Sequence, residues 1–449
     1  MKEVIVSVRL LPLLLGVFLS LPAGAAPLYK VRTEFPVAND DVNCIAIDWV
    51  RDIVYIGGEF TDVGGQARSR IAAIDANTGA LLPWNPGANG IVMTIAVAGD
   101  NVYVGGTFTE FGGQARNRAA ATDVSGNVLP WNPDADSYVK VIAVNGQAVY
   151  LTGDFGHLGG AARSRFGNVT KDTGAVLSWA PTGLGEASTL ALSGTAVYMG
   201  GNFSTINSTT REKIAAVSLT GTLLSWDPGA DGFVGEILLD RGALFLAGGF
   251  TQIAGTPRSY LAQVSATGTL LSWAPEADDS VSGMAKSGNR LYVGGGFSLI
   301  NGQVRERLAA IDEDGNLLPW NPPVEGFVKT VSEHEGTVFL GGHMDAAGGI
   351  DRKNFSAIYD PDLLPKPTVS IKGNATRKTA KPVIKLRGSS GNATRVLVKS
   401  GKGPFRLAKG VKRWYRNIRL KPGRNRIFVR SINAADAESN LSRILVDRE

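Results

Sequence analysis

The chain has 449 residues, of which 44% are hydrophobic and 19% are charged, and its formal net charge is +6. This composition is too apolar for a disordered polymer, and its 56 glycines lack the three-residue period of collagen. The single cysteine, Cys44, excludes an intramolecular disulfide framework and a thiolate zinc cluster. The chain is therefore expected to fold around hydrophobic cores.

The amino terminus has the pattern of a signal peptide. Lys2 and Arg9 supply positive charge, residues 10–21 form an apolar run of 12, and small residues lead up to Ala25. We expect residues 1–25 to be removed by cleavage after Ala25. An uncleaved anchor is the alternative, but 12 helical residues rise only about 18 Å, against roughly 30 Å of hydrocarbon. The protein is therefore predicted to be secreted, periplasmic or at the cell surface, with no transmembrane segment after cleavage.

Three markers repeat along the chain with one period of 47 or 48 residues. The string Val-Tyr-Ile-Gly-Gly-Glu-Phe, which ends at Phe60, recurs in recognisable form with its last position at Phe108, Phe155, Phe203, Phe250, Phe297 and Met344. An arginine follows each of these positions by eight residues, at Arg68, Arg116, Arg163, Arg211, Arg258, Arg305 and Arg352. A Trp-x-Pro unit occurs at Trp84, Trp131, Trp179, Trp226, Trp273 and Trp320. The markers define seven repeats.

Each repeat has the pattern of short β-strands. In the second repeat, apolar runs at residues 93–97 and 102–104 flank a turn, and further runs follow at residues 118–122 and 127–131. No stretch keeps the helical spacing of apolar residues for long. Four strands in a repeat of this length predict one blade of a β-propeller. We expect an all-β fold in which residues 26–364 form a seven-bladed β-propeller.

The last repeat lacks a tryptophan and a full fourth strand, whereas residues 28–35 precede the first inner strand without a partner of their own. We expect this amino-terminal segment to supply the missing outer strand. Such pairing would join the first and last blades and cover an edge that could otherwise aggregate.

The aromatic markers are interpreted as structural residues. The phenylalanines are expected to fill the wedges between blades, and the Trp-x-Pro unit to end the fourth strand, because proline cannot donate a ladder hydrogen bond. Exposed tryptophan rings that bind carbohydrate are the alternative.

The seven arginines are candidates for either of two roles. Pinning of loops is the first, through ion pairs or hydrogen bonds to the residues three positions after each proline, which are mostly acidic or amide side chains. A ligand-binding ring for anions on one face is the alternative. The residues after the prolines are Asn39, Asn89, Asp136, Leu184, Asp231, Asp278 and Glu325.

The repeats resemble those of the delta-60 repeat β-propellers, a family of largely uncharacterised secreted proteins. The resemblance rests on the run from Gly57 to Arg68 and the run from Ala72 to Pro86, and it covers roughly residues 40–360. It implies a propeller and brings no catalytic residues. The fourth repeat departs from the pattern at Asn207-Ser208, and the seventh at Met344.

The Ala-x-Asp, Thr-Gly and Trp run is also similar to the tryptophan-docking motif of quinoprotein dehydrogenase propellers, which bind pyrroloquinoline quinone and calcium. Here the tryptophan falls one residue later, and the chain has no adjacent cysteine pair. Shared blade packing accounts for the likeness, so no cofactor is predicted.

A second domain is expected at residues 366–449, after a Pro-rich linker. This segment carries 22 Lys or Arg against 4 Asp or Glu, a net charge of +18, whereas residues 1–365 have a net charge of −12. Apolar residues alternate along about seven predicted strands, which favours a small antiparallel β-sandwich. The run from Leu420 to Val429 resembles the late-strand hairpin of bacterial immunoglobulin-like modules.

The partners implied are extracellular. The basic module is expected to bind an anionic cell-envelope polymer, with docking on the acidic propeller as the alternative, and export argues against nucleic acid. The partner of the propeller, a protein or a glycan, and the oligomeric state are left open.

Catalytic and metal-binding patterns are scarce. The three histidines, His157, His334 and His343, lack metalloprotease spacing, and neither a nucleophile elbow nor a phosphate-binding Gly-Lys loop occurs. No catalytic, cofactor-binding or metal residue is predicted. The sequence therefore favours a secreted scaffold for binding or adhesion, with an extracellular enzyme, carbohydrate-active or quinone-dependent, as the alternative.

Overall fold

The computed structural model describes residues 29–146, 148–363, 368–371, 376–379, 383–391, 393, 395–400, 405–432 and 442–448. Within these residues every regular element is a β-strand and no helix occurs. The expected all-β fold is confirmed. The predicted signal peptide, residues 1–25, lies outside the described residues.

Each repeat contributes one small antiparallel sheet, ordered inner strand, second strand, third strand. The inner strands are β2 (Val42–Asp48), β7 (Val92–Ala98), β12 (Val139–Asn145), β18 (Ala187–Leu192), β23 (Val234–Asp240), β28 (Val281–Ser287) and β33 (Val324–His334). The second strands are β3 (Ile53–Gly58), β8 (Asn101–Gly106), β13 (Ala148–Gly153), β19 (Ala196–Gly201), β24 (Ala243–Gly248), β29 (Arg290–Gly295) and β34 (Thr337–Ala347). The third strands are β6 (Ile71–Asp75), β11 (Ala119–Asp123), β16 (Phe166–Thr170), β22 (Ile214–Ser218), β27 (Leu261–Ser265), β32 (Leu308–Asp312) and β36 (Phe355–Tyr359).

The fourth strand expected in each repeat is shorter than the sequence suggested. In the first six repeats it is reduced to one isolated bridge to the third strand, such as Thr122 to Val128 in the second repeat. The segment turns away here because its tryptophan inserts against the next sheet and the proline that follows cannot donate a ladder hydrogen bond.

The connection between the second and third strands contains a short two-residue ladder in each repeat. These ladders are formed by β4 (Asp62–Val63) with β5 (Gln66–Ala67), β9 (Glu110–Phe111) with β10 (Gln114–Ala115), β14 (His157–Leu158) with β15 (Ala161–Ala162), β17 (Gly183–Leu184) and β21 (Thr209–Thr210) with β20 (Thr205–Ile206), β25 (Gln252–Ile253) with β26 (Thr256–Pro257), β30 (Leu299–Ile300) with β31 (Gln303–Val304), and β34 with β35 (Ile350–Asp351).

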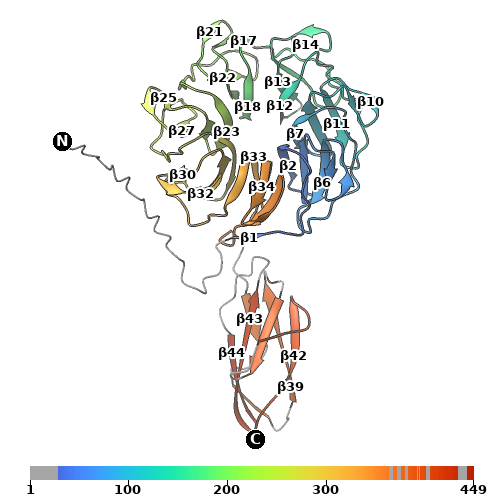
Figure 1. Cartoon of the computed structure of the whole chain (residues 1–449), viewed down its shortest axis with the longest axis vertical. Helices are drawn as coiled ribbons and strands as arrows, with labels where there is room; N and C mark the ends of the chain where they lie inside the picture. Colours follow the sequence, from blue (N-terminus) through green and yellow to red (C-terminus); the bar gives the residue numbers. More distant parts are fainter. Residues whose placement is uncertain are drawn as a thin grey trace, which may run out of the picture.

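The seven sheets lie around a common centre with their inner strands nearest to it (Figure 1). Each inner strand contacts the inner strand of the following repeat, in the order β2, β7, β12, β18, β23, β28 and β33, and β33 contacts β2 again. Every inner strand also has an irregular register near its start, such as that between Val92 and Thr94.

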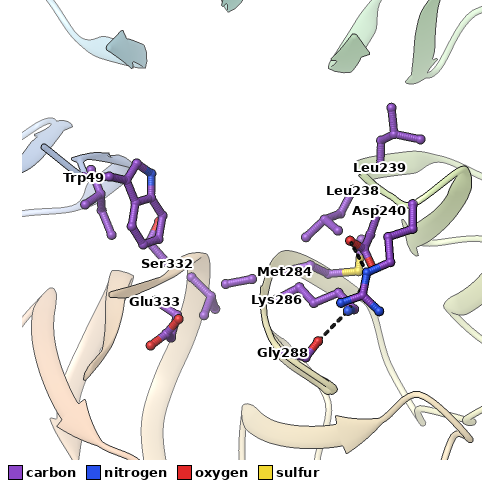
Figure 2. Close-up of a pocket in the computed structure, with 13 residues that line it drawn as sticks. Trp49, Leu238, Leu239, Asp240, Met284, Lys286, Gly288, Ser332 and Glu333 are labelled. Atoms are coloured by element: carbon purple, nitrogen blue, oxygen red, sulfur yellow. Dashed lines mark hydrogen bonds and ion pairs between the residues drawn. The ribbon is translucent and has the colours of Figure 1, made fainter. Parts of the chain in front are cut away.

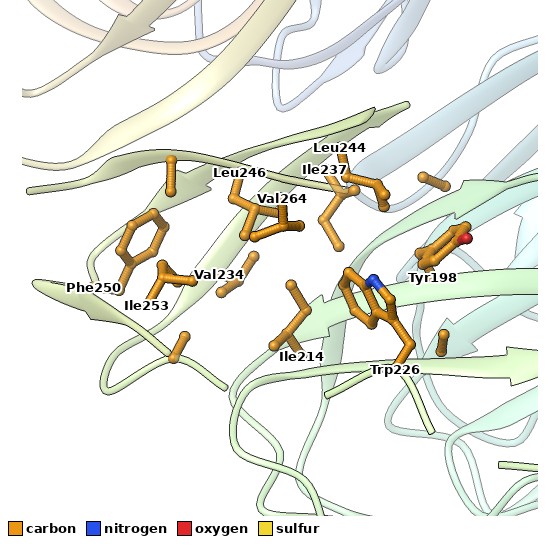
Figure 3. Close-up of a cluster of buried hydrophobic side chains, with 14 of the residues drawn as sticks. Tyr198, Ile214, Trp226, Val234, Ile237, Leu244, Leu246, Phe250, Ile253 and Val264 are labelled. Carbon is orange, nitrogen blue, oxygen red and sulfur yellow. The ribbon is translucent and has the colours of Figure 1, made fainter. Parts of the chain in front are cut away.

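Hydrophobic clusters join each sheet to the next. In the cluster of Figure 3, Ile214 and Trp226 of the fourth repeat pack with Val234, Leu246 and Phe250 of the fifth. All six Trp-x-Pro tryptophans are at most 5% exposed, and the marker phenylalanines at most 1%. The indole Nε1 of each tryptophan donates to a backbone carbonyl at the end of the next third strand, over 2.9–3.3 Å. These side chains therefore lie in the hydrophobic clusters and not on the surface.

The amino-terminal segment pairs with the last repeat. Strand β1 (Lys30–Val31) lies antiparallel to β36, with Lys30 opposite Tyr359. Arg32 connects the two ends of the repeat array, because its Nη1 donates to Ala76 O of the first repeat over 2.9 Å and to Thr337 Oγ1 of the seventh over 3.3 Å. The pairing expected for residues 28–35 is thus observed at β1.

The carboxy-terminal strands form two sheets around one hydrophobic cluster. The three-stranded sheet has the order β37 (Thr368–Ile371), β39 (Val383–Gly391), β42 (Arg413–Arg419). The five-stranded sheet has the order β38 (Thr376–Thr379), β44 (Ser442–Arg448), β43 (Gly423–Ile432), β40 (Arg395–Ser400), β41 (Arg406–Leu407). One pairing differs from the expected antiparallel arrangement, because β38 runs parallel to β44. Parallel neighbours need a long connection, and here nearly the whole module separates them.

Candidate functional site

The hairpin that joins the first two strands is longer in the first repeat than in the others. Four residues, 49–52, separate β2 from β3, whereas two residues separate the corresponding strands in most repeats, as at 99–100. The additional residues include Trp49 and Val50, which are 61% and 87% exposed. All seven other tryptophans of the chain are buried. In repeat proteins an insertion in one repeat often marks the binding face.

The Trp49 loop is held in place by its own side chains. Asp48 Oδ1 accepts the backbone N–H of Val50 over 3.0 Å and that of Arg51 over 3.1 Å. Arg51 in turn donates to Asp48 Oδ2 over 2.8 Å and to the carbonyl of Gly99 in the second repeat over 3.1 Å. Partial burial alone would raise the pKa of Asp48, but the hydrogen bonds from Arg51 and the backbone outweigh it and lower that pKa. The loop is therefore fixed before any ligand arrives.

The Trp49 ring is also supported from the seventh repeat. The indole lies edge-on to the His334 imidazole, with ring centroids 5.0 Å apart. His334 Nε2 lies 2.8 Å from Asp52 Oδ1, at the other end of the same loop. The Asp52 contact fixes the orientation of the His334 ring. The edge-to-face contact with this ring in turn fixes the orientation of the Trp49 indole, while most of the indole surface stays exposed to solvent.

Beside Trp49 is a cavity of about 480 Å³, within the usual range for small-ligand sites. Figure 2 shows Trp49 on one side and the ends of β23 and β28 on the other. We call it the mouth cavity, because it lies where the inner strands end. Its apolar lining consists of Ile47, Trp49, Leu238, Leu239, Met284, Ala285 and Val331, and its polar lining of Asp240, Arg241, Lys286, Gly288, Ser332 and Glu333.

The charged groups of the mouth cavity are largely neutralised by each other. Lys286 Nζ lies 2.8 Å from both Asp240 Oδ2 and Glu313 Oε1. Burial would lower the pKa of Lys286, but these two carboxylates outweigh it and raise that pKa, so the ammonium stays charged. Glu333 Oε1 accepts the backbone N–H of Gly336 over 2.6 Å. What remains for a ligand is an apolar floor, the Trp49 face and a polar rim.

Glu236 is an unusual carboxyl group on an inner strand. It occupies a position where other inner strands carry Thr94 or Thr189, whose hydroxyls accept a backbone N–H from the next inner strand over 3.2 Å and 3.1 Å. Among the described residues none donates a hydrogen bond to the Glu236 carboxylate. Burial raises its pKa to about 8.

Replacing Glu236 with glutamine should change how stability depends on pH. The folded protein keeps a proton that the unfolded chain releases near pH 4.5, so the free energy of unfolding of the wild type should fall as pH rises from about 4.5 to about 8. The Glu236→Gln variant should match the wild type below pH 4.5 and be more stable at pH 8. Urea titrations at both pH values measure this difference, and parallel pH profiles for the two proteins would contradict it.

The seven arginines considered for loop pinning or for an anion ring are hydrogen-bonded to the backbone of their own repeats. In the first six, Nη1 donates to the carbonyl of the preceding residue over 2.7–2.9 Å and Nη2 to a leucine carbonyl of the fourth segment over 2.6–3.2 Å. In the seventh, Arg352 donates to Phe35 O over 2.6 Å, so the amino-terminal segment replaces the leucine. This geometry favours the pinning role, and anion binding by the ring stays a prediction.

The partners of these arginines differ from those expected. Among the described residues none of the seven forms an ion pair with the residues after the prolines, although Arg211 forms one with Asp227 over 3.3 Å. Asp136, Asp231 and Asp278 instead accept two successive backbone N–H groups of the neighbouring loop, over 2.7–3.0 Å. These aspartate carboxylates bind the backbone N–H groups and not the arginine side chains, because the two N–H groups are adjacent in the chain and otherwise unpaired.

The three histidines lie on separate elements and each contacts one aspartate. His157 Nδ1 lies 2.8 Å from Asp136, and His343 Nδ1 lies 2.7 Å from Asp41. Within the described parts of the chain, no three His, Cys, Asp or Glu side chains are grouped so that they could hold a metal ion. None of the described residues forms a helix that is long and apolar enough to cross a membrane.

Comparisons with protein-family models and with curated proteins find no match. Among solved structures, the computationally designed protein Ika8 is 14% identical, with a TM-score of 0.45, over 73% of this chain and 98% of the designed chain. A fungal alcohol oxidase of the AA5 family, solved in complex with copper, is 12% identical, with a TM-score of 0.45, over 94% of this chain and all of that one. Similarities this distant carry no argument about function.

Proposed function

We propose that the chain is a secreted binding scaffold in which residues 26–364 form a closed seven-bladed β-propeller and residues 366–449 an immunoglobulin-like β-sandwich. Seven sheets with contacts from each to the next support the ring, and the pairing of β1 with β36 supports its closure. Two sheets around one core support the sandwich. The period and the markers support membership of the delta-60 repeat family, and the pattern of residues 1–25 supports export.

The observation that carries a binding role is the mouth cavity with its exposed Trp49. The seven repeats are alike in packing, yet at this end of the inner strands one repeat carries an insertion with a fixed, exposed indole. A flat apolar ring beside an apolar floor and a polar rim suits a ligand that has one apolar face and hydroxyl groups at its edge, as a sugar ring has. The proposed ligand is therefore an extracellular glycan.

Fluorescence tests this proposal directly, because Trp49 is the exposed indole of the chain. Titration with cello-, chito- and malto-oligosaccharides should identify a sugar that protects tryptophan emission from acrylamide. The Trp49→Ala variant lacks the reporter indole, so its affinity and that of the wild type are compared by isothermal titration calorimetry; the variant should lose at least about tenfold, the loss expected for an interfacial aromatic anchor. Val50→Ala, in the same loop, is the control and should bind as the wild type does. Absence of saturable protection by any glycan of a broad array would exclude the proposed ligand.

A further inference from the structure

The basic side chains around the mouth cavity are already paired with carboxylates. Those in the hairpins that join the inner and second strands are Arg51, Arg241, Lys286 and Arg290. Each forms ion pairs with two acidic residues, and these partners are Asp48, Asp100, Asp240, Glu313, Asp360 and Asp362. Six carboxylates for four cations leave no positive charge in excess, so these hairpins do not favour an anionic ligand.

The carboxylates on the Trp49 side of the cavity have no such partners. Glu333 and Glu335 flank His334 in the sequence, and Asp52 contacts the His334 imidazole that supports Trp49. Among the described residues no lysine or arginine forms an ion pair with Glu333, Glu335 or Asp52. This side of the cavity therefore carries negative charge that the protein itself does not compensate.

Of these three carboxylates, Glu333 lines the mouth cavity. Its side chain is only 5% exposed, and its Oε1 accepts the backbone N–H of Gly336 over 2.6 Å. Within the described part of the chain no group donates a hydrogen bond to its second oxygen, Oε2. A carboxylate with so little access to water is costly unless a cation or further donors reach it. A ligand in the cavity can supply that cation.

Trp49 and Glu333 lie on one side of the mouth cavity, across from Asp240 and Lys286 (Figure 2). The face of an aromatic ring attracts cations, and tryptophan attracts them most strongly. An ammonium group on this side is therefore favoured by both side chains. We propose that the ligand of the mouth cavity is an amino sugar, whose ring packs on Trp49 and whose free ammonium group binds the Glu333 carboxylate. This inference rests on the proposed glycan function and names the class of sugar.

Other ligands fit these charges less well. A sugar acid would bring a further carboxylate toward Glu333, where no unpaired cation receives it. A neutral sugar packs on Trp49 but leaves the charge of Glu333 uncompensated. A lysine side chain of a protein partner carries the same ammonium group, but its flexible four-carbon stem has no flat ring to pack on the indole.

A matched pair of oligosaccharides tests the proposal on the full chain. The glucosamine tetramer of chitosan and the N-acetylglucosamine tetramer of chitin have the same rings and linkage, and they differ in whether the nitrogen is a charged amine or a neutral amide. Calorimetric titration at about pH 6 keeps ordinary carboxylates ionised and amines protonated. The amine tetramer should bind about tenfold more tightly, as expected for hydrogen bonds to a charged group, and high salt should reduce this preference.

Two variants identify the carboxylate responsible. Glu333→Gln keeps an oxygen that accepts the Gly336 N–H and replaces the other oxygen with an amide NH₂ group, so it should bind the two tetramers equally within about twofold. Glu335→Gln removes the same charge from the adjacent turn, outside the lining of the cavity, and should keep the preference for the amine. Equal melting temperatures confirm that both variants fold. If Glu333→Gln does not fold, the comparison of the two tetramers on the wild type still decides.

The proposal is wrong if the wild type binds the acetylated tetramer as tightly as the amine tetramer, or binds neither. It is also wrong if Glu333→Gln keeps the preference, which would then reflect the size of the acetyl group, or if both variants lose it equally, which would mean that net charge alone attracts the ligand. Tetralysine that binds as tightly as the amine tetramer, with the same dependence on Glu333, would make the cavity a site for a basic peptide. Binding of any other glycan that requires Trp49 would leave the proposed function intact, whereas failure of every glycan would remove both.

Discussion

Replacing Trp131 with alanine is expected to cost about 3–5 kcal/mol of folding free energy, the range measured for large aromatic side chains in cores. The side chain is completely buried between the second and third repeats. Its ring centroid lies 5.1 Å from that of Tyr103 in an edge-to-face contact, and its Nε1 donates to Thr170 O over 2.9 Å. The substitution therefore leaves a cavity and an unpaired carbonyl at the same place. Urea unfolding followed by circular dichroism measures the loss.

Two variants separate the contributions to this loss. Trp131→Phe keeps a ring and removes the hydrogen bond, so it should cost less than alanine does. Trp49→Ala removes the same side chain where it is 61% exposed, and should change stability by about 0.5 kcal/mol or less. If Trp131→Ala and Trp49→Ala were equally stable, the indoles of the repeats would not hold the sheets together.

Removal of residues 26–35 is expected to give a protein that aggregates or is rapidly cleaved by proteases. Without β1, the outer edge of β36 loses its pairing and becomes available to strands of other molecules. The deletion also removes Arg32, which joins the first and seventh repeats, and Phe35, whose ring centroid lies 5.5 Å from that of Phe339. Size-exclusion chromatography and limited proteolysis measure the effect.

A chain that begins at Tyr29 is the matched control, because it keeps β1, Arg32 and Phe35. It should elute and melt as the longer mature chain does. Monomeric elution and an unchanged melting temperature for the chain that lacks residues 26–35 would show that the pairing of β1 with β36 contributes nothing to the integrity of the repeat array.

The sequence alone predicted those features that depend on a short residue pattern recurring in every repeat. Strand positions followed from apolar runs such as residues 93–97, since the observed strand is Val92–Ala98. Burial of Trp131 and Phe108 followed from repetition, because a side chain needed at the same place in every sheet recurs with the period of the chain. The pairing of the amino-terminal segment with the last repeat followed from a missing strand at one end and an additional one at the other.

Features that depend on competition between partners could not be read in this way. The arginines hydrogen-bond to the backbone of their own repeats, but Arg116 binds the Leu129 carbonyl and not an acidic side chain, because adjacent backbone amides occupy the aspartates. The fourth strands shrink to single bridges because the tryptophan that ends each one packs against the next sheet. In every repeat the residue two positions after the marker arginine adopts a left-handed backbone although it is not glycine, as Arg118 does with φ of 64°, and this conformation is set by loop closure.

The candidate sites also combine features that the sequence predicts with features that only the tertiary structure shows. The insertion that carries Trp49 lies before the first marker, Phe60, so the spacing of the markers could not reveal it. Sequence by itself determined the period, the all-β fold and the charge of the module, because these depend on residues close together in the chain. Only the tertiary structure placed Trp49 beside Leu238 and Met284, and Glu333 in the wall of the same cavity. A binding surface is built from side chains that approach through space, and their distances are decided by how whole sheets pack.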